Sequence, residues 1–244
     1  MLSMSLNKKL WFICKTGAAS LHGEPDFNSP CLTELVYGES AKINEKKSNW
    51  LNVDCEDGYN GWIHSFYGLE SRSKKTSDYV IAFPCSDGLF KPSLPFGSRT
   101  KGSFSGSSPT NKKLGIEKVV QILNNLLGIP YKWGGKTSLG FDCSGLVQSV
   151  LYVCGFMVPR DAHQQKVFFR NSETTIDDSE PGDLHFFGKN GSVSHVGLSI
   201  GDSDFIHSQG VVKIDSLNET SKIFNKNLFD IYLSTCSIKR TFHI

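Results

Sequence analysis

The chain has 244 residues, enough for one large domain or two modest ones, and its hydrophobic (39%) and charged (20%) fractions are ordinary for a globular protein. A formal net charge of +2, with lysines and arginines scattered along the chain, does not favour a nucleic-acid partner. No apolar stretch approaches the length of a transmembrane helix, so we expect no membrane span.

The cysteines and the N-terminus bear on the compartment. Seven cysteines form an odd, irregularly spaced set without a Cys-x-x-Cys pair, which favours reduced thiols and folding in the cytosol. Lys8 and Lys9 precede the apolar run Leu10–Cys14, which is too short for the core of a signal peptide. We therefore expect a buried strand there and a cytoplasmic protein, with the periplasm or export by another route as the alternative.

Residues 10–69 have the pattern of an all-β domain. Short apolar runs alternate with turn signals such as Gly23-Glu24-Pro25-Asp26 and Glu56-Asp57-Gly58. Within residues 50–55 the apolar side chains alternate, as they do in a half-buried strand. The pattern predicts a small barrel or curled sheet.

The segment that follows carries weaker signals, and residues 102–111 are rich in glycine and serine. We predict an N-terminal domain over residues 1–105 and a linker over residues 106–113. Residues 75–105 either complete the first domain or form a degenerate second copy of it.

Residues 114–244 show helical patterns first and strand patterns afterwards. A stripe at helical spacing predicts a helix over residues 114–127, ended by Gly128. The stripe consists of Ile116, Val119, Val120, Leu123 and Leu127. Strand patterns separated by turns fill the chain beyond residue 183, so we predict an α+β domain with a mostly antiparallel sheet.

Within this domain, the stretch Phe141–Val147 places Cys143 in the first turn of a buried helix. Asp142 stands at the N-cap position, and Phe141 and Leu146 stand where the two residues of a hydrophobic staple belong. The positive end of a helix dipole favours a thiolate, so Cys143 is a candidate nucleophile.

A nucleophilic thiol needs a base, and the predicted hairpin of residues 195–207 offers two histidines. If the loop Gly201–Ser203 has three residues, His195 lies diagonally from His207 on one face, with about 7–8 Å between their Cα atoms. A two-residue loop would place the histidines on opposite faces. The arithmetic permits Cys143 as nucleophile, His195 as base and His207 as the group that orients His195.

The motifs resemble those of two families. Residues 33–39, 49–53 and 57–63 resemble, in order and spacing, a bacterial SH3 (SH3b) domain. Six later blocks resemble the successive motifs of the NlpC/P60 family of papain-like cysteine peptidases. These blocks are Pro130–Gly135, Phe141–Val147, Pro159–Gln165, Pro181–Phe187, Ser194–Leu198 and Phe205–Ser208. The resemblance implies a papain-like α+β catalytic domain behind a small all-β SH3b-like barrel.

The whole chain is similar to the γ-D-glutamyl-L-diamino acid endopeptidases of that family, which implies a reaction. Cys143 would attack the amide between the side-chain carboxyl of D-Glu and the amine of a diamino acid, expected to be meso-diaminopimelate. His195 would transfer the proton, and Tyr131 would contact the oxyanion or the substrate. The substrates would be peptides derived from peptidoglycan, and no cofactor or metal is implied.

The resemblance also implies a site for the free amino group of an N-terminal L-Ala. Asp142 and Ser144 would bind this ammonium together with one acidic residue and one tyrosine of the SH3b-like domain. We take Glu39 and Tyr59 as those two residues, with Tyr37 as the alternative tyrosine. Trp133 is expected to lie in the core.

Three other functions stay open at this point. An amidase or acyltransferase would use the same thiol with a different acyl acceptor. A non-catalytic module that binds the cell wall would rely on the SH3b-like domain alone. One cysteine and two histidines would also suit zinc, although the local ligand pairs typical of zinc sites are missing.

Overall fold

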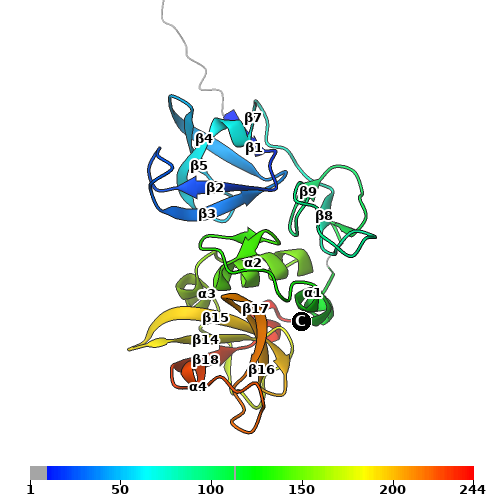
Figure 1. Cartoon of the computed structure of the whole chain (residues 1–244), viewed down its shortest axis with the longest axis vertical. Coiled ribbons are helices and arrows are strands. Elements are labelled where there is room, and N and C mark those ends of the chain that lie inside the picture. The colour runs from blue at the N-terminus through cyan, green and yellow to red at the C-terminus, as the bar shows by residue number, and fades with distance from the viewer. Residues whose placement is uncertain (1–9, 113) are drawn as a thin grey trace, which may run out of the picture.

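The computed structural model describes residues 10–112 and 114–244. Residues 1–9 of the expected first domain, which include Lys8 and Lys9, and Lys113 of the expected linker lie outside the described residues. Figure 1 shows an N-terminal β domain above an α+β part, with helix α2 (Cys143–Cys154) between the two sheets. Within the described part of the chain, every helix is too short or too polar to cross a membrane.

The N-terminal domain is a seven-stranded antiparallel sheet in the order β3-β2-β6-β5-β4-β1-β7. Its strands are β1 (Leu10–Cys14), β2 (Ala18–His22), β3 (Cys31–Val36), β4 (Ser40–Lys47), β5 (Trp50–Asp54), β6 (Asn60–His64) and β7 (Gly68–Ser71), and the 3-10 turn η1 (Ser65–Tyr67) precedes β7. Leu51 and Val53 of β5 are buried, as the alternation predicts. The expected curled β domain is confirmed.

A small three-stranded sheet follows, in the order β10-β8-β9. It consists of β8 (Tyr79–Ile81), β9 (Arg99–Thr100) and β10 (Ser107–Pro109). Strand β10 lies inside the segment expected to be a linker. The chain turns back at Gly106, whose φ of 79° suits glycine and whose carbonyl accepts hydrogen bonds from the N–H groups of Ala82 and Phe83. That this sheet is a reduced second SH3 unit stays a prediction.

The helix predicted over residues 114–127 is shorter in the structure, and its buried face is rotated relative to the prediction. It consists of a 3-10 turn, η2 (Ile116–Lys118), and α1 (Val119–Asn124). Ile122 and Leu126 are fully buried, whereas Leu127 of the predicted stripe is 39% exposed. The 3-10 turn has three residues per turn instead of 3.6, so it shifts the phase of the buried face.

The C-terminal sheet has six antiparallel strands in the order β13-β18-β14-β15-β16-β17. They are β13 (Glu173–Thr174), β14 (Leu184–Lys189), β15 (Ser192–Gly201), β16 (Asp204–Gln209), β17 (Val211–Ser216) and β18 (Tyr232–Cys236). The other elements are the ribbon β11 (Lys136–Thr137) with β12 (Gly140–Phe141), and the helices α3 (Ala162–Phe168), α4 (Lys226–Phe229) and α5 (Ile238–Phe242). The predicted order, an all-β domain before an α+β domain, is confirmed.

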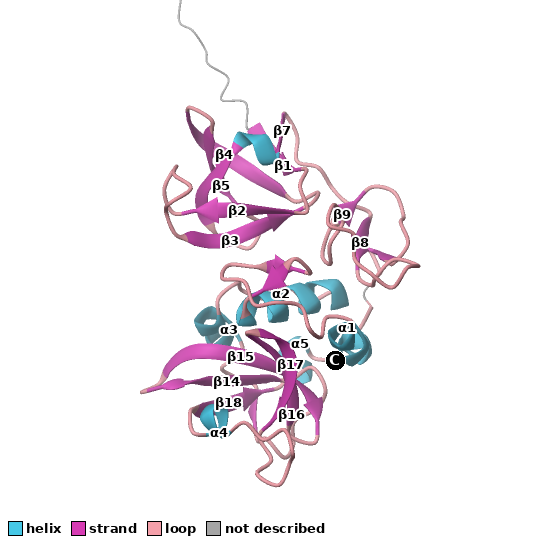
Figure 2. Ribbon diagram, in the orientation of Figure 1, coloured by secondary structure: helices cyan, strands magenta, loops and turns pink. Residues whose placement is uncertain are grey.

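Helix α2 fixes the position of the candidate nucleophile. It packs across β15 and β16, on the side of the sheet that faces the N-terminal domain (Figure 2). Leu146, Val150 and Leu151 are fully buried and share one core with Leu198 and Ile206 of these strands. Each such side chain stabilises the fold by about 1.5–3 kcal/mol, so the first turn of α2 is held firmly against the sheet.

Candidate active site

Cys143 is the first residue of α2, where the sequence places it. Oδ1 of Asp142 accepts a hydrogen bond from the N–H of Gly145 at 2.6 Å, which makes Asp142 the N-cap. Phe141 and Leu146 are fully buried on either side of this cap, as expected of a hydrophobic staple. The local sequence therefore sets the thiol at the start of a buried helix.

The thiol rests against β15, because backbone groups of Val196 and Ser144 hydrogen-bond to it. Burial raises the pKa of Cys143 to about 11, and the charge of Asp142 adds to the increase, while these backbone hydrogen bonds oppose it. The helix dipole favours a thiolate, but the resting form of Cys143 is therefore the neutral thiol. Burial disfavours the charged sulfur more than the helix terminus favours it.

The two predicted histidines meet on one face of the sheet. Nε2 of His195 lies 2.8 Å from Nδ1 of His207, and the two rings are nearly perpendicular at 86°. Because Nε2 of His195 is engaged in this contact, Nδ1 is the nitrogen left for the thiol. The backbone of Val196, which bonds the sulfur, directly follows His195, so the thiol rests against the part of β15 that carries this histidine.

The hairpin reaches the predicted register by a different turn. Leu198 pairs with Ile206, which is the alignment that puts both histidines on one face. The turn itself has two residues, Asp202 and Ser203, with φ values of 54° and 66°, and not the predicted three. A bulge before Gly201 absorbs the extra residue, so the register is confirmed and the loop length is wrong.

A carboxylate that the sequence analysis missed stands behind His207. Oδ2 of Asp215 on β17 lies 2.9 Å from Nε2 of His207, 2.5 Å from Nδ2 of Asn225 and 3.1 Å from Nζ of Lys213. Burial alone would raise the pKa of Asp215, but these three hydrogen bonds lower it to about 2. His207 pairs with Lys213, so the alternation of β17 could have placed Asp215 diagonally beside it.

Both imidazoles are neutral in the resting site. Burial lowers the pKa of His195 to about 3, and positive charge on His207 and Lys213 acts in the same direction. Burial also lowers the pKa of His207, although the hydrogen bond and charge of Asp215 oppose the shift. A neutral thiol beside a neutral imidazole suits general-base catalysis, in which the proton moves as the sulfur attacks.

Tyr131 is held near this site, because its backbone pairs with that of Phe141, two residues before Cys143. Burial raises the pKa of its phenol, and negative charge on Cys143 and Asp142 adds to the increase. The next aromatic residue differs from expectation, because Trp133 is 71% exposed and does not lie in the core. Its Nε1–H donates to the carbonyl of Cys31 at 3.1 Å, which holds the ring along β3.

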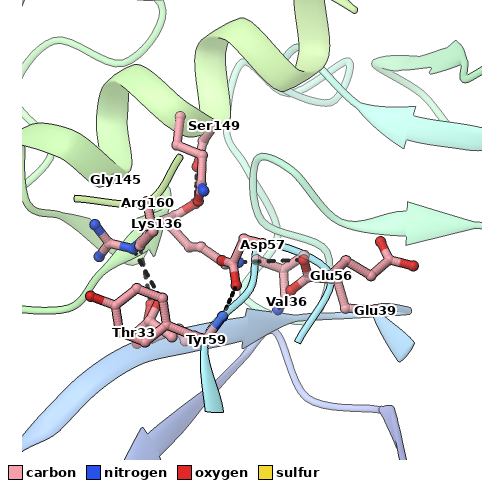
Figure 3. Close-up of polar contacts among 12 residues, drawn as sticks. Thr33, Val36, Glu39, Glu56, Asp57, Tyr59, Lys136, Gly145, Ser149 and Arg160 are labelled. Carbon is pink, nitrogen blue, oxygen red and sulfur yellow. Dashed lines mark hydrogen bonds and ion pairs between the residues drawn. The ribbon is translucent and has the colours of Figure 1, made fainter. Parts of the chain in front are cut away.

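Asp142 is already engaged by a buried arginine. Nη1 and Nη2 of Arg160 donate to its two carboxylate oxygens at 2.9 and 2.6 Å, and Nη1 also donates to Oγ of Ser144 at 3.1 Å. Nε of Arg160 reaches Oγ1 of Thr33 across the domain boundary at 2.9 Å (Figure 3). The structure thus brings Asp142 and Ser144 together, with Arg160 as their common cationic partner.

Glu39 does not join this group. Its carboxylate accepts from the N–H of Val36 at 2.7 Å and pairs with Arg99 at 2.6 Å and Lys136 at 3.3 Å. In Figure 3 it lies beside Glu56, away from Arg160 and Thr33. These partners saturate the carboxylate in a buried position, so the prediction of Glu39 as a substrate ligand is corrected.

A second carboxylate of the same motif lies at the boundary with the catalytic part. Glu34 on β3 is 1% exposed, accepts from the backbone N–H of Lys136 at 3.3 Å and forms an ion pair with the ammonium of Lys132. The hydroxyl of Tyr59 donates to Asp161 in the C-terminal part of the chain, and its role as a substrate ligand stays a prediction. The sequence did not distinguish Glu34 from Glu39, which lies five residues further along.

In residues 10–112 and 114–244, no three His, Cys, Asp or Glu side chains are arranged to hold a metal ion.

Comparison with known families matches both parts of the chain. Residues 128–231 match the NlpC/P60 family, and residues 21–65 match a domain described as the bacterial dipeptidyl-peptidase SH3 domain. The gamma-D-glutamyl-L-lysine dipeptidyl-peptidase of Bacillus subtilis is 28% identical over 86% of this chain and 81% of its own. Dipeptidyl-peptidase 6 of Lysinibacillus sphaericus is 27% identical over 86% of this chain and 93% of its own.

A solved structure agrees with the fold. The NlpC/P60 endopeptidase of Photobacterium damselae subsp. piscicida superimposes with a TM-score of 0.65 over 96% of this chain and 72% of its own. The two sequences are only 14% identical, so this likeness concerns the arrangement of the elements alone.

Proposed function

Because the chain carries an NlpC/P60 domain behind a bacterial SH3 domain, we propose that it is a cysteine endopeptidase that acts on peptidoglycan stem peptides. It hydrolyses the bond between the side-chain carboxyl of D-Glu and a diamino acid, in peptides with a free N-terminal L-Ala. The observation that carries the proposal is Cys143 at the head of α2, hydrogen-bonded to the backbone of Val196, next in sequence to His195, whose ring contacts that of His207. The names of the two dipeptidyl-peptidase relatives support it.

The reaction begins from the neutral pair. The sulfur of Cys143 attacks the carbonyl carbon while His195 takes the thiol proton, so no free thiolate is needed beforehand. His195 then gives this proton to the departing amine, and a thioester remains on Cys143. A water molecule, deprotonated by His195, attacks the thioester, and the peptide acid leaves as the thiol is restored.

Negative charge develops on the carbonyl oxygen during both attacks. The backbone N–H of Cys143, at the start of α2, is an oxyanion donor because helix N-termini leave such groups without an intrahelical partner. The hydroxyl of Tyr131 is assigned as the second donor, because the backbone of Tyr131 pairs with that of Phe141, two residues before Cys143. Both donors belong to rigid segments, since Tyr131 is anchored by its N–H to the carbonyl of Gly210 at 2.8 Å.

The free amino group has a matching place at the domain boundary. Glu34 is buried with the ammonium of Lys132 as its cation, and the Lys132 side chain is 44% exposed. A substrate ammonium carries the same charge and the same three donors, so it replaces Lys132 on Glu34 without leaving a buried charge unpaired. We therefore assign this role to Glu34 in place of Glu39, and keep Tyr59, whose hydroxyl reaches Asp161 across the domain boundary, as the tyrosine of this site. Asp142 and Ser144 form the floor of this site together with Arg160, which donates hydrogen bonds to both.

This arrangement explains why two residues would be released together. The ammonium site lies on β3 of the SH3 domain and the thiol on α2 of the catalytic domain. An L-Ala-γ-D-Glu unit that binds Glu34 by its ammonium presents the γ-carbonyl to Cys143. The cleavage point is then set by distance from the free N-terminus.

The test compares L-Ala-γ-D-Glu-diaminopimelate with its N-acetylated form by mass spectrometry, and includes the L-Lys peptide. We expect L-Ala-D-Glu from the free peptide, little or none from the acetylated one, and none with Cys143→Ala. Cys85→Ala, which removes a partly exposed thiol outside the site, is the control and retains activity. Equal cleavage of both peptides would refute the ammonium site, and an active Cys143→Ala variant would refute the nucleophile.

A further inference from the structure

The carboxylate of Asp215 lies behind the two histidines and is not explained by the reaction steps alone. It sits on the third strand of a row, since β15 carries His195, β16 carries His207 and β17 carries Asp215. The contacts run from His195 Nε2 to His207 Nδ1 at 2.8 Å, and from His207 Nε2 to Asp215 Oδ2 at 2.9 Å.

Asn225, at the end of this row away from Cys143, sets the direction of every hydrogen bond in the row. Asn225 caps α4, and its Oδ1 accepts from the N–H of Leu228 at 3.1 Å. The amide nitrogen of Asn225 must therefore point at Asp215, which it reaches at 2.5 Å. Oδ2 of Asp215 also accepts a hydrogen bond from Nζ of Lys213, so this oxygen is an acceptor toward each of these neighbours.

An acceptor at this position fixes the protons on both rings. His207 must carry its proton on Nε2 to donate to Asp215, so its Nδ1 presents a lone pair. That lone pair accepts from Nε2–H of His195. The remaining nitrogen of His195, Nδ1, is then unprotonated and free to take the thiol proton.

We propose that Asp215, oriented by Asn225, is a positioning residue that sets the tautomers of His207 and His195 so that Nδ1 of His195 is always the base. The negative charge also stabilises the imidazolium that forms on His195 during attack, transmitted through His207. Asp215 touches neither substrate nor sulfur, so it acts only through the rings. The effect on turnover rests on the proposed function, whereas the effect on the tautomers does not.

Two substitutions separate the acceptor from the charge. In Asp215→Asn the amide oxygen takes the Oδ2 position, because Asn225 and Lys213 both donate there; the acceptor is kept and the charge is lost. In Asp215→Ala both are lost. Hydrogen bonds to charged groups contribute about 1.5–3 kcal/mol, so we expect kcat to fall roughly tenfold in Asp215→Asn and roughly a hundredfold in Asp215→Ala, with KM unchanged.

The ¹⁵N NMR spectrum of the two rings in the ligand-free protein tests this role. If Asp215 were merely structural, its loss would leave this spectrum unchanged. We expect wild type and Asp215→Asn to show both histidines protonated on Nε2, and Asp215→Ala to show a mixture of tautomers. Asp230→Asn is the control, because this exposed carboxylate pairs with Lys226 and lies outside the row.

Wild-type tautomers and wild-type kcat in Asp215→Ala would overturn the proposal. So would an equal loss in both variants that tracks a lowered melting temperature with unchanged ring spectra. If the wild-type protein cleaves no peptide at all, the proposed function fails, and the ¹⁵N spectra still decide whether Asp215 sets the tautomers.

Discussion

The two sides of Cys143 are built in different ways. On the histidine side, the side chains come from three consecutive strands, and His195 and Asp215 are close in sequence. On the SH3 side, the contacts join residues about a hundred positions apart, such as Glu34 with Lys132 and Thr33 with Arg160. Strand register fixes the first side, whereas the docking of one domain on another fixes the second.

The difference predicts a division of labour. Changes on the histidine side should lower kcat, because in the proposed reaction these rings take up and return the proton. Changes on the SH3 side should raise KM or loosen the domain boundary, because those residues contact each other and, in the proposed function, bind the amino terminus of the substrate.

Lys136→Met should weaken the domain boundary most. Lys136 is buried between Glu39 and Asp57 at 3.3 Å each, so its loss leaves the buried carboxylate of Asp57 without its ion-pair partner, while Glu39 keeps Arg99. Removing one partner of a buried ion pair costs about 3–5 kcal/mol, measurable as the free energy of unfolding in urea. Lys101→Met, which removes an exposed pair with Asp78, should cost under about 1 kcal/mol. Equal losses would show that the boundary does not depend on this network.

Glu34→Gln should separate binding from chemistry. It keeps the size of the side chain and removes the charge that would hold the substrate ammonium. A charged hydrogen bond contributes about 1.5–3 kcal/mol, so KM for the free peptide should rise roughly tenfold to a hundredfold with little change in kcat. Steady-state kinetics check this, with Glu70→Gln, an exposed carboxylate on the same sheet, as the control. A fall in kcat with unchanged KM would contradict the division.

The histidine side should make the fold sensitive to acid. Burial lowers the pKa of His185 to about 4 and that of His195 to about 3, both below the value of about 6.5 in an unfolded chain. Between these values the unfolded chain binds protons that the folded chain excludes, so the free energy of unfolding falls as the pH falls. Each histidine contributes about 1.4 kcal/mol per pH unit.

His185→Phe isolates one of these contributions. The urea unfolding curve should lose about 1.4 kcal/mol per unit of its pH dependence between about pH 4 and pH 6.5, because one buried group no longer titrates. Thr235, which bonds Nδ1 of His185 at 2.8 Å, keeps the hydroxyl of Tyr232 as a partner. Unchanged pH dependence in the variant would mean that His185 has the same pKa in the folded and unfolded protein.

Local signals account for what could be predicted. The cap at Asp142, the staple of Phe141 and Leu146, and the register of His195 with His207 depend on residues within a short stretch of chain. The register was correct although the turn was not, because the bulge before Gly201 compensates for the shorter loop. The fold class followed from the same kind of periodicity.

Collective properties account for what could not. Glu34 and Glu39 lie in one motif, and only the docking of β3 on residues 131–136 shows which of them faces the catalytic domain. The neutral thiol of Cys143 reflects burial by the whole fold and not the helix terminus alone. Asp215 could have been predicted from the sequence, because the alternation of β17 places it beside His207.

The central claim is a thioester on Cys143, and mass spectrometry of the enzyme tests it most directly. Enzyme mixed with L-Ala-γ-D-Glu-diaminopimelate is quenched in acid over times from milliseconds to minutes, digested and analysed. We predict an L-Ala-D-Glu acyl group on the peptide that contains Cys143, removable by hydroxylamine. Release of product at the full rate with the acyl group on another cysteine, or with Cys143 unmodified at every time, would contradict the account.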